Sequence, residues 1–255
     1  MKRAGLAGFT SQRVLESLSD YLCYLELHVE QGGVLADSKE QIGVVQGIVC
    51  IHNLDVTFRG VPNHAGTTPM KGRKDALVGA SELVVKVAEA VSKAGGGATT
   101  GTCGQLEVSP GARNVIPGEV KLAIEVRDLL PQVADRVLSV LMSEARLISE
   151  RYCLEVDFER VSRTPPAGMD DKIQKTIFGQ AKSLGLKTRY MPSGASHDAA
   201  VFAKYVPTGM IFVPSRDGIS HSPDEWTDKQ DCINGANVLL KTLLYIAEQG
   251  EGFFS

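Results

Sequence analysis

The stretch EVKLAIEVRD (119–128) decides the fold of the central part of the chain. Apolar and polar residues alternate along it, which is the pattern of a strand with one buried face. LDVTFRG (54–60) and YCLEVDFERV (152–161) alternate in the same way, and TGTCGQLEV (100–108) also has the composition of a strand. These four segments predict an antiparallel sheet with one apolar face.

Two helical segments separate these strands. From Asp75 to Ala94, apolar residues recur at spacings of three and four until a run of glycines ends the pattern. Residues 131–150 form the second predicted helix, with Pro131 at its first position. Residues 52–163 therefore follow the order β-α-β-β-α-β, the ferredoxin-like pattern of one antiparallel sheet with two helices on one face.

The flanking segments predict a second, α/β part of the chain. LCYLELHVE (22–30) and IGVVQGIVCI (42–51) are mostly apolar, as buried strands are. After the linker RTPPAG (163–168), segments with helical and strand patterns alternate, which indicates an α/β layer. We therefore predict two domains, an α/β domain interrupted by an inserted α+β domain, with the bounds 1–51 and 164–255 for the first and 52–163 for the second.

Composition excludes several classes of protein. The chain has 255 residues, 43% of them hydrophobic and 22% charged, which is typical of a globular protein with a large core. A net charge of −3 gives no basic excess for nucleic acid or an anionic membrane, and no apolar run approaches the roughly 18 residues of a membrane span. The N-terminus lacks the apolar stretch of a signal peptide. Five cysteines without C-x-x-C spacing argue against a disulfide framework and predict a cytoplasmic protein.

Two histidines are candidate metal ligands. His28 ends a predicted buried strand beside Glu26 and Glu30, where a ring nitrogen can face a metal at the edge of a sheet. His221 lies in SHSPDEW, a loop that follows another buried strand. Neutral imidazoles suit zinc, and carboxylates complete such shells, although a single histidine is most often an ordinary surface or core residue.

Three further candidates fall on the inserted domain. His64, in the loop NHAGTTPM, can stabilise negative charge on a substrate oxygen. Arg127 closes an alternating strand, where its planar guanidinium suits a carboxylate unless it forms a surface ion pair. Asn114 lies in a loop held by two prolines, as a substrate contact or as a turn residue.

The segment SGASHDA (193–199) excludes two classes of enzyme. It lacks the lysine and the spacing of a Walker phosphate loop, and it lacks the G-x-S-x-G elbow of serine hydrolases. Its glycine turn precedes a predicted helix, so its backbone N–H groups remain able to bind an anion.

Taken together, six segments resemble one family. ELHVEQG, NHAGTTPM, ARNVIPGEV, SGASHDA, GMIFVPS and ISHSPDEWT follow the order seen in hydantoinase/carbamoylase-type amidohydrolases. This group includes N-carbamoyl-L-amino-acid hydrolases, allantoate amidohydrolases, ureidoglycolate amidohydrolases and β-ureidopropionases, within the dinuclear-metal aminoacylase and carboxypeptidase superfamily. The resemblance covers about residues 20–248. It implies a metallo-exopeptidase-like catalytic domain, partial in this chain, with an inserted lid that is also the dimerisation domain.

The resemblance implies a reaction and the residues nearest to it. His28 and His221 match metal ligands, and members of the family use two divalent ions drawn from Zn, Mn, Co and Ni. His64 matches a lid histidine that helps to polarise the scissile ureido carbonyl. The implied activity is metal-dependent hydrolysis of the C–N bond of an N-carbamoyl amino acid or a related ureido compound such as allantoate, with release of CO2 and ammonia.

The resemblance also implies how substrate is held. Asn114 and Arg127 match residues that bind the substrate carboxylate, typically at the active site of the partner subunit. Gly194 matches a backbone contact to substrate. The expected partners are therefore a small ureido or carbamoyl substrate with a carboxylate, and a second copy of the chain in a homodimer formed through the inserted domain.

Two departures from the family pattern set limits on these expectations. A glutamine that touches substrate in some relatives corresponds to Ile51, next to His52. The family also carries an upstream histidine, a bridging aspartate and a Glu-Glu pair, whereas residues 1–27 contain no histidine. We therefore expect this chain to supply only part of the metal site and to show weak or no metal binding and little activity. The alternatives are a truncated, non-catalytic dimerisation or ligand-binding relative and a related aminoacylase or dipeptidase.

Overall fold

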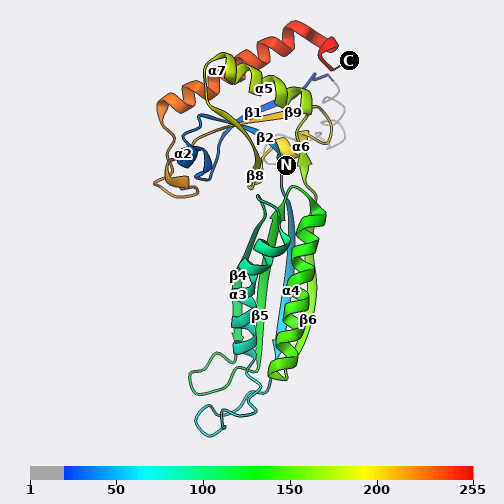
Figure 1. Cartoon of the computed structure of the whole chain (residues 1–255), viewed down its shortest axis with the longest axis vertical. Helices are drawn as coiled ribbons and strands as arrows, with labels where there is room; N and C mark the ends of the chain where they lie inside the picture. Colours follow the sequence, from blue (N-terminus) through cyan, green and yellow to red (C-terminus); the bar gives the residue numbers. More distant parts are fainter. Residues whose placement is uncertain (1–19, 255) are drawn as a thin grey trace, which may run out of the picture. The chain divides into compact units, whose positions relative to one another are not determined.

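The computed structural model describes residues 20–254, and the chain divides into two compact units (Figure 1). Unit 1 combines Met1–Ile48 with Ala167–Ser255, and unit 2 is the continuous segment Val49–Pro166. Both ends of unit 2 lie three residues outside the insert expected at 52–163. The α/β fold class predicted from the sequence is confirmed, because both units combine a sheet with helices.

Unit 2 contains a four-stranded antiparallel sheet in the order β4-β5-β3-β6. Its strands are β3 (Cys50–Arg59), β4 (Thr100–Ser109), β5 (Glu119–Asp128) and β6 (Glu155–Thr164). In order along the chain, the sheet reads second, third, first and fourth strand, which is the ferredoxin-like arrangement. Every second residue of β5 is buried, as its alternating sequence predicts.

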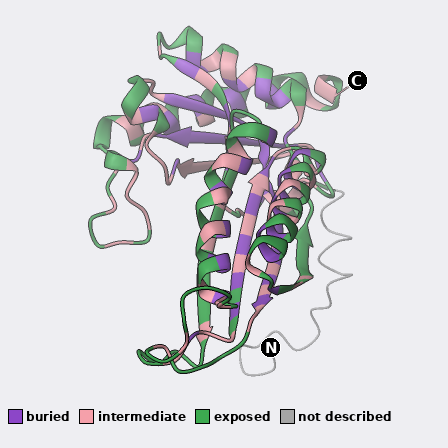
Figure 2. Ribbon diagram, turned by 60° about the horizontal axis from the view of Figure 1, so that its bottom comes forward, coloured by how far each residue is buried: buried purple, intermediate pink, exposed green. Residues whose placement is uncertain are grey.

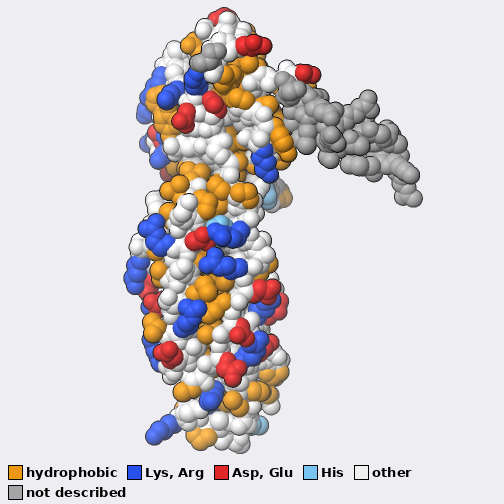
Figure 3. Space-filling model, turned by 90° about the vertical axis from the view of Figure 1, so that its right-hand side faces the viewer, with side chains coloured by type: hydrophobic (Ala, Val, Ile, Leu, Met, Phe, Trp, Pro, Cys, Tyr) orange, Lys and Arg blue, Asp and Glu red, His pale blue; other side chains and the backbone are white. Residues whose placement is uncertain are grey.

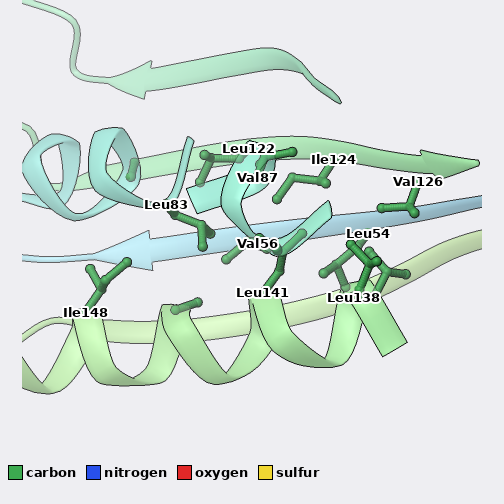
Figure 4. Packing of buried hydrophobic residues seen from close by; sticks show 14 of the residues in the cluster. Leu54, Val56, Leu83, Val87, Leu122, Ile124, Val126, Leu138, Leu141 and Ile148 are labelled. Carbon is green, nitrogen blue, oxygen red and sulfur yellow. The ribbon is translucent and has the colours of Figure 1, made fainter. Parts of the chain in front are cut away.

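Two helices cover the apolar face of this sheet (Figure 2), α3 (Ala76–Ala94) and α4 (Pro131–Tyr152). Asp75 caps α3 by accepting two backbone hydrogen bonds, and Pro131 occupies the first turn of α4. Both helices and the sheet contribute to one core (Figure 4), whose fully buried side chains include Leu54, Val56, Leu83, Leu122 and Leu141. Each apolar stripe is therefore buried within unit 2 itself.

Unit 1 is built on a five-stranded mixed sheet, in which β1 pairs with β9, and β9 with β2. Its strands are β1 (Tyr24–Val29), β2 (Ile42–Ile48), β7 (Ala167–Gly168), β8 (Thr188–Ser193) and β9 (Thr208–Val213). β1 runs parallel to β9, whereas β2 runs antiparallel to β9 and parallel to β8. This mixed sheet carries the candidate metal ligands on β1.

Helices complete unit 1. The long helices are α5 (Asp171–Ser183) and α7 (Lys229–Gln249), which share an apolar core with one face of the sheet. The short helical segments are α2 (Val34–Ser38), α6 (Ala199–Phe202), η2 (Arg216–Gly218) and η3 (Gly250–Phe254). The other sheet face packs against α2 and α6 around Leu35, Met210 and Phe212.

Three predicted elements are corrected by the structure. The sequence predicts one strand over 42–51, but β2 ends at Ile48 and β3 begins at Cys50, because the chain changes sheets there. The helix predicted after the glycine turn of SGASHDA is only the four residues of α6, Ala199–Phe202. The linker predicted over 163–168 is largely strand, since β6 reaches Thr164 and β7 follows. Apolar residues continue from β2 into β3, so the sequence pattern does not show where the first strand ends and the second begins.

On the face of the molecule drawn in Figure 3, acidic and basic side chains are interspersed, so this face carries no large patch of a single charge. None of the helices in residues 20–254 is long and apolar enough to cross a membrane. All five cysteines are unpaired.

Candidate metal centre and substrate-binding residues

Strand β1 positions two candidate ligands on one side of the sheet in unit 1. Glu26 and His28 are two residues apart, so their side chains point to the same side, whereas Leu25 and Leu27 pack in the core with α5 and α7. The ring of His197, in the loop after β8, lies 4.6 Å from that of His28 in edge-to-face contact. One potential ligand atom from each of Glu26, His28 and His197 lies within 4.8 Å of the other two.

Hydrogen bonds define which nitrogen of each ring is open. His28 Nδ1 lies 2.8 Å from the carbonyl oxygen of Val29, so Nδ1 carries the proton and Nε2 keeps its lone pair. His197 Nε2 lies 2.7 Å from Ser193 Oγ. His197 Nδ1 lies 3.7 Å from Glu26 Oε1, beyond hydrogen-bond distance. The open nitrogens of the two rings are therefore His28 Nε2 and His197 Nδ1.

Glu26 is held by its second carboxylate oxygen. Glu26 Oε2 accepts hydrogen bonds from the N–H of Ala199 at 2.8 Å and from the hydroxyl of Tyr24 at 3.2 Å. The Tyr24 ring stacks on Phe202 with centroids 4.0 Å apart. Burial, together with the Glu26 carboxylate, raises the pKa of Tyr24 to about 12, so its hydroxyl remains a donor at neutral pH.

The electrostatics of His197 suit a metal ligand. Its side chain is 1% exposed. Burial, together with the neighbouring His28, lowers the pKa of His197 to about 4, so the ring is neutral at neutral pH, the form that binds metals. Two imidazoles and one carboxylate form the donor set of catalytic zinc sites that keep a fourth position open. The residues present therefore fit a divalent cation.

His221 lies in a different environment of unit 1. It is exposed, its φ is 56°, and its backbone N–H donates to Glu225 Oε2 at 2.8 Å. Its Nε2 lies 3.2 Å from Gln31 Nε2, on the segment that follows β1. The fold thus brings His221 close to a residue three positions after His28, but His221 is not a member of the Glu26–His28–His197 group.

Glu30, which sequence reasoning places beside His28, has a structural role. Its side chain is buried, and its two carboxylate oxygens accept the backbone N–H groups of Val34 and Leu35 at 2.8 Å each. Glu30 thereby satisfies two free donors at the start of α2, which has no side-chain cap from Gly33.

His64 lies in an exposed loop of unit 2, between β3 and α3. Its Nδ1 accepts the backbone N–H groups of Gly66 at 3.1 Å and Thr67 at 3.2 Å, which leaves Nε2 as the protonated nitrogen. The guanidinium of Arg73 donates to three carbonyl oxygens of the same loop. The imidazole is therefore held as a hydrogen-bond donor at the surface of unit 2.

Asn114 lies beside His64. Its carbonyl oxygen accepts the N–H of Ala65 at 2.9 Å, and Val115 forms a bridge with His64. The Asn114 side chain is exposed. The loops that carry His64 and Asn114 therefore run together at the end of unit 2 where β5 begins.

Arg127 lies at the opposite end of β5, level with Ile51 of β3, and its Nε is 2.7 Å from Glu125 Oε1. The eight residue steps from Glu119 to Arg127 span about 27 Å at about 3.4 Å per residue. An N-carbamoyl amino acid is much shorter than this distance. Within one copy of the chain, the structure therefore does not bring Asn114 and Arg127 to the same carboxylate.

Gly194 follows β8 directly, between Ser193 and the segment that carries His197. It is exposed, and no atom lies within 4 Å of the position that a Cβ would occupy. Sequence reasoning identifies this segment only as a glycine turn and misses His197 as a partner of His28. The only local signal is a histidine directly before a helix, which does not by itself indicate a ligand.

These features define a class of protein. The fold is an α/β unit with a candidate histidine–carboxylate metal centre, combined with a ferredoxin-like unit. The chain belongs to peptidase family M20/M25/M40, whose sequence profile matches residues 5–245.

Two of the relatives within this family are named as amidohydrolases. The chain is 37% identical to the N-carbamoyl-L-amino acid amidohydrolase of Geobacillus stearothermophilus, over 98% of this chain and 61% of that protein. It is 35% identical to the allantoate amidohydrolase of Escherichia coli K12, over 95% of this chain and 59% of that protein. The chain thus spans about three fifths of the length of these relatives.

Solved structures agree with the sequence relatives. A hydantoinase/carbamoylase family amidase from Burkholderia multivorans superposes with a TM-score of 0.83 at 35% identity, over 88% of this chain and 54% of that one. The predicted resemblance to this group of amidohydrolases is confirmed.

Proposed function

We propose that this chain acts in metal-dependent hydrolysis of the C–N bond of an N-carbamoyl amino acid or a related ureido compound such as allantoate, with release of CO2 and ammonia. The observation that carries the proposal is the Glu26–His28–His197 group in a chain 37% identical to an N-carbamoyl-L-amino acid amidohydrolase. Divalent ions supply the polarisation of the ureido carbonyl and the activation of water in such a reaction.

His28 and His221 are the metal ligands of this proposal. The proposed reaction uses two divalent ions drawn from Zn, Mn, Co and Ni, and His28 and His221 would be among the residues that hold them. Gln31 lies three residues after His28, and its side-chain amide is 3.2 Å from His221 Nε2. This proximity supports the assignment of both histidines as metal ligands. The chain supplies only part of a two-ion shell.

His64 is the catalytic residue that stabilises negative charge developing on the ureido oxygen. Its Nδ1 is occupied by two backbone donors, so its Nε2–H is the group that donates to the substrate. A donor held in place before the reaction stabilises such charge without a cost of reorganisation. Removal of one such donor typically lowers kcat by about 10²–10³-fold.

Arg127, Asn114 and Gly194 bind the substrate. Arg127 holds the carboxylate through its planar guanidinium, and the backbone of Gly194 contacts the substrate. Since β5 spans about 27 Å from Glu119 to Arg127 and Asn114 lies in the loop before Glu119, the Asn114 that reaches the same substrate belongs to a second copy. His64 accompanies Asn114, because their loops are paired.

The second copy is supplied by a homodimer formed through unit 2, which serves as the lid and dimerisation domain. The edge strands of its sheet, β4 and β6, each have one unpaired edge among the described strands, and such edges are sites of pairing with another chain. We place the enzyme in the cytoplasm, where five unpaired cysteines are stable.

Ammonia release tests the proposal. The full chain is incubated with Zn²⁺, Mn²⁺, Co²⁺ or Ni²⁺ and with N-carbamoyl-L-amino acids, allantoate or, as a comparison, dipeptides. We expect slow, metal-dependent release of ammonia from the ureido substrates that is lost in His28→Ala and Arg127→Ala. The surface variant Glu248→Gln on α7 is the control. A chain that still binds a carbamoyl amino acid in His28→Ala but not in Arg127→Ala, and releases no ammonia, is a ligand-binding relative and contradicts the proposal.

A further inference from the structure

We propose that Arg73 is the positioning residue for His64, because its guanidinium holds the backbone segment that fixes the His64 ring. The inference deepens the proposed function, on which the catalytic role of His64 rests. The contacts themselves belong to unit 2 and do not require the chain to be hydrolytically active.

The guanidinium of Arg73 binds three backbone carbonyls of the loop that carries His64. Arg73 Nη2 donates to the carbonyl oxygens of Ala65 and Thr68, at 2.6 Å each. Arg73 Nε lies 3.2 Å from the same Thr68 oxygen and 3.3 Å from the carbonyl oxygen of Pro69. Two nitrogen atoms of one rigid plane therefore reach three oxygens, and hydrogen bonds from a charged donor are the stronger kind.

The contact with Ala65 acts on the ring of His64 through a single peptide group. The Ala65 carbonyl and the Gly66 N–H belong to the same planar trans peptide, so they point in opposite directions. The Gly66 N–H donates to His64 Nδ1 at 3.1 Å, while the Ala65 carbonyl accepts from Arg73. Arg73 thus sets the orientation of the peptide group whose N–H occupies Nδ1, which leaves Nε2 as the protonated nitrogen.

The contact with Thr68 holds the backbone of His64. Thr68 Oγ1 donates to the His64 carbonyl oxygen at 2.8 Å, and the Thr68 N–H donates to the same oxygen at 3.2 Å. The Thr68 carbonyl in turn accepts from both Nε and Nη2 of Arg73. Both the ring and the backbone of His64 are therefore bound to residues that Arg73 holds in place.

Arg73 lies on a segment that is fixed by other contacts. The carbonyl of the next residue, Lys74, accepts the N–H of Val61 at 2.9 Å, directly after β3 and Gly60. Asp75 then caps α3 by accepting two backbone hydrogen bonds. The guanidinium therefore ties the loop of His64 to the start of a packed helix, and a functional group is held most exactly when its supporting residues lie on rigid elements.

A lysine does not reproduce this arrangement. Its ammonium is a single point charge on a flexible stem, whereas the three carbonyl oxygens are held here by one planar group. Arg73→Lys therefore keeps the charge and removes the geometry, and Arg73→Gln removes both. Lys71→Gln is the matched control, because it removes the same charge from an exposed position of the same connection between β3 and α3.

Nitrogen NMR of the His64 ring, together with amide hydrogen exchange of Gly66, tests the inference in the full chain. We expect the wild-type chain and Lys71→Gln to show the Nε2–H tautomer and the same exchange rate. In Arg73→Gln and Arg73→Lys we expect both tautomers to be populated. The exchange rate of the Gly66 amide is expected to rise at least about tenfold, because hydrogen bonds from a charged donor no longer hold its peptide group.

Circular dichroism checks that each variant is folded, and Arg73→Lys decides the question if Arg73→Gln unfolds. The inference is overturned if His64 keeps its tautomer and Gly66 its exchange rate in Arg73→Gln. Retention of both in Arg73→Lys overturns the assignment to the guanidinium plane, because charge alone would then be sufficient.

Ammonia release separates this inference from the proposed function. In an active chain, we expect Arg73→Lys to lower kcat by about 10–100-fold with KM nearly unchanged. Because Arg73 acts through His64, adding Arg73→Lys to His64→Asn is expected to cause no further loss, and additive losses would overturn the inference. A chain that releases no ammonia contradicts the proposed function, whereas the NMR and exchange measurements still decide whether Arg73 positions His64.

Discussion

His64 shows at the scale of a single residue how backbone contacts set the chemistry of a side chain. Two backbone N–H groups, from Gly66 and Thr67, point at its Nδ1. We therefore expect nitrogen NMR of the full chain at neutral pH to show the Nε2–H tautomer of His64, identified by its loss in His64→Asn. A protonated Nδ1 in the neutral ring would contradict the assignment of His64 as a donor to substrate.

His52 gives unit 2 a pH-dependent stability. Its side chain is 4% exposed, with Nδ1 3.2 Å from Asp135 Oδ1, and Arg160 and Arg163 of β6 also contact Asp135. Burial lowers the pKa of His52, and the two arginines add to this effect while Asp135 opposes it. The unfolded chain therefore binds a proton near pH 6.5 that the folded chain does not bind.

Because only the unfolded chain binds this proton on His52, a lower pH favours unfolding. The free energy of unfolding contributed by neutral His52 is fully present above about pH 7 and falls as the pH drops through about 6.5. We expect the urea midpoint of the wild-type chain to fall more between pH 7.5 and 5.5 than that of His52→Gln. Equal losses of the urea midpoint in the wild-type chain and in His52→Gln would contradict the prediction.

At the scale of an element, Gly60 fixes the base of the loop that carries His64. A Cβ at this position would lie 2.0 Å from the carbonyl oxygen of Lys74, a backbone atom that cannot turn away. The Gly60 N–H donates to the Gly118 carbonyl at 2.8 Å, so the strand cannot easily shift either. We expect Gly60→Ala to lower the free energy of unfolding by about 1–3 kcal/mol, measured by urea denaturation.

Gly104 is the matched control for this substitution. It lies in the same unit, in β4, and a Cβ added there would have no atom within 4 Å. Gly104→Ala is therefore expected to leave the urea midpoint nearly unchanged. A similar loss of stability in both variants would mean that backbone freedom, and not the close approach to Lys74, accounts for the effect.

At the scale of the whole molecule, the two units have separate cores. The larger apolar cluster draws only on residues of unit 2, from Cys50 to Leu154, and the other two clusters draw only on unit 1. Because unit 2 is one continuous segment with its own core, we expect residues 49–166 expressed alone to unfold cooperatively. Thermal unfolding followed by circular dichroism measures this.

A core substitution makes the same test quantitative. Leu141 of α4 is fully buried in the cluster of unit 2. Leu141→Ala is expected to lower the free energy of unfolding of the excised unit by about 2–5 kcal/mol. A broad, non-cooperative transition of the unsubstituted segment, unchanged by Leu141→Ala, would show that unit 2 depends on the rest of the chain.

The sequence by itself determined the elements of unit 2 and the family. The alternation in EVKLAIEVRD and the apolar stripe of α3 are local patterns, and the packing preserves them because each element buries its own apolar face. The ordered motifs around His28, His64 and His221 identified the amidohydrolase group for the same reason, since each motif is a short local segment.

Only the tertiary structure decided which residues share a site. His197 meets Glu26 and His28 because the loop after β8 packs beside β1, a contact between distant segments that no local pattern records. Arg127 and Asn114 are close in sequence and yet lie at opposite ends of unit 2, because the extended strand β5 separates them. The periodicity of the sequence determines which face of a helix or strand is buried. The order of strands in the sheet and the packing of loops determine which side chains from distant segments meet.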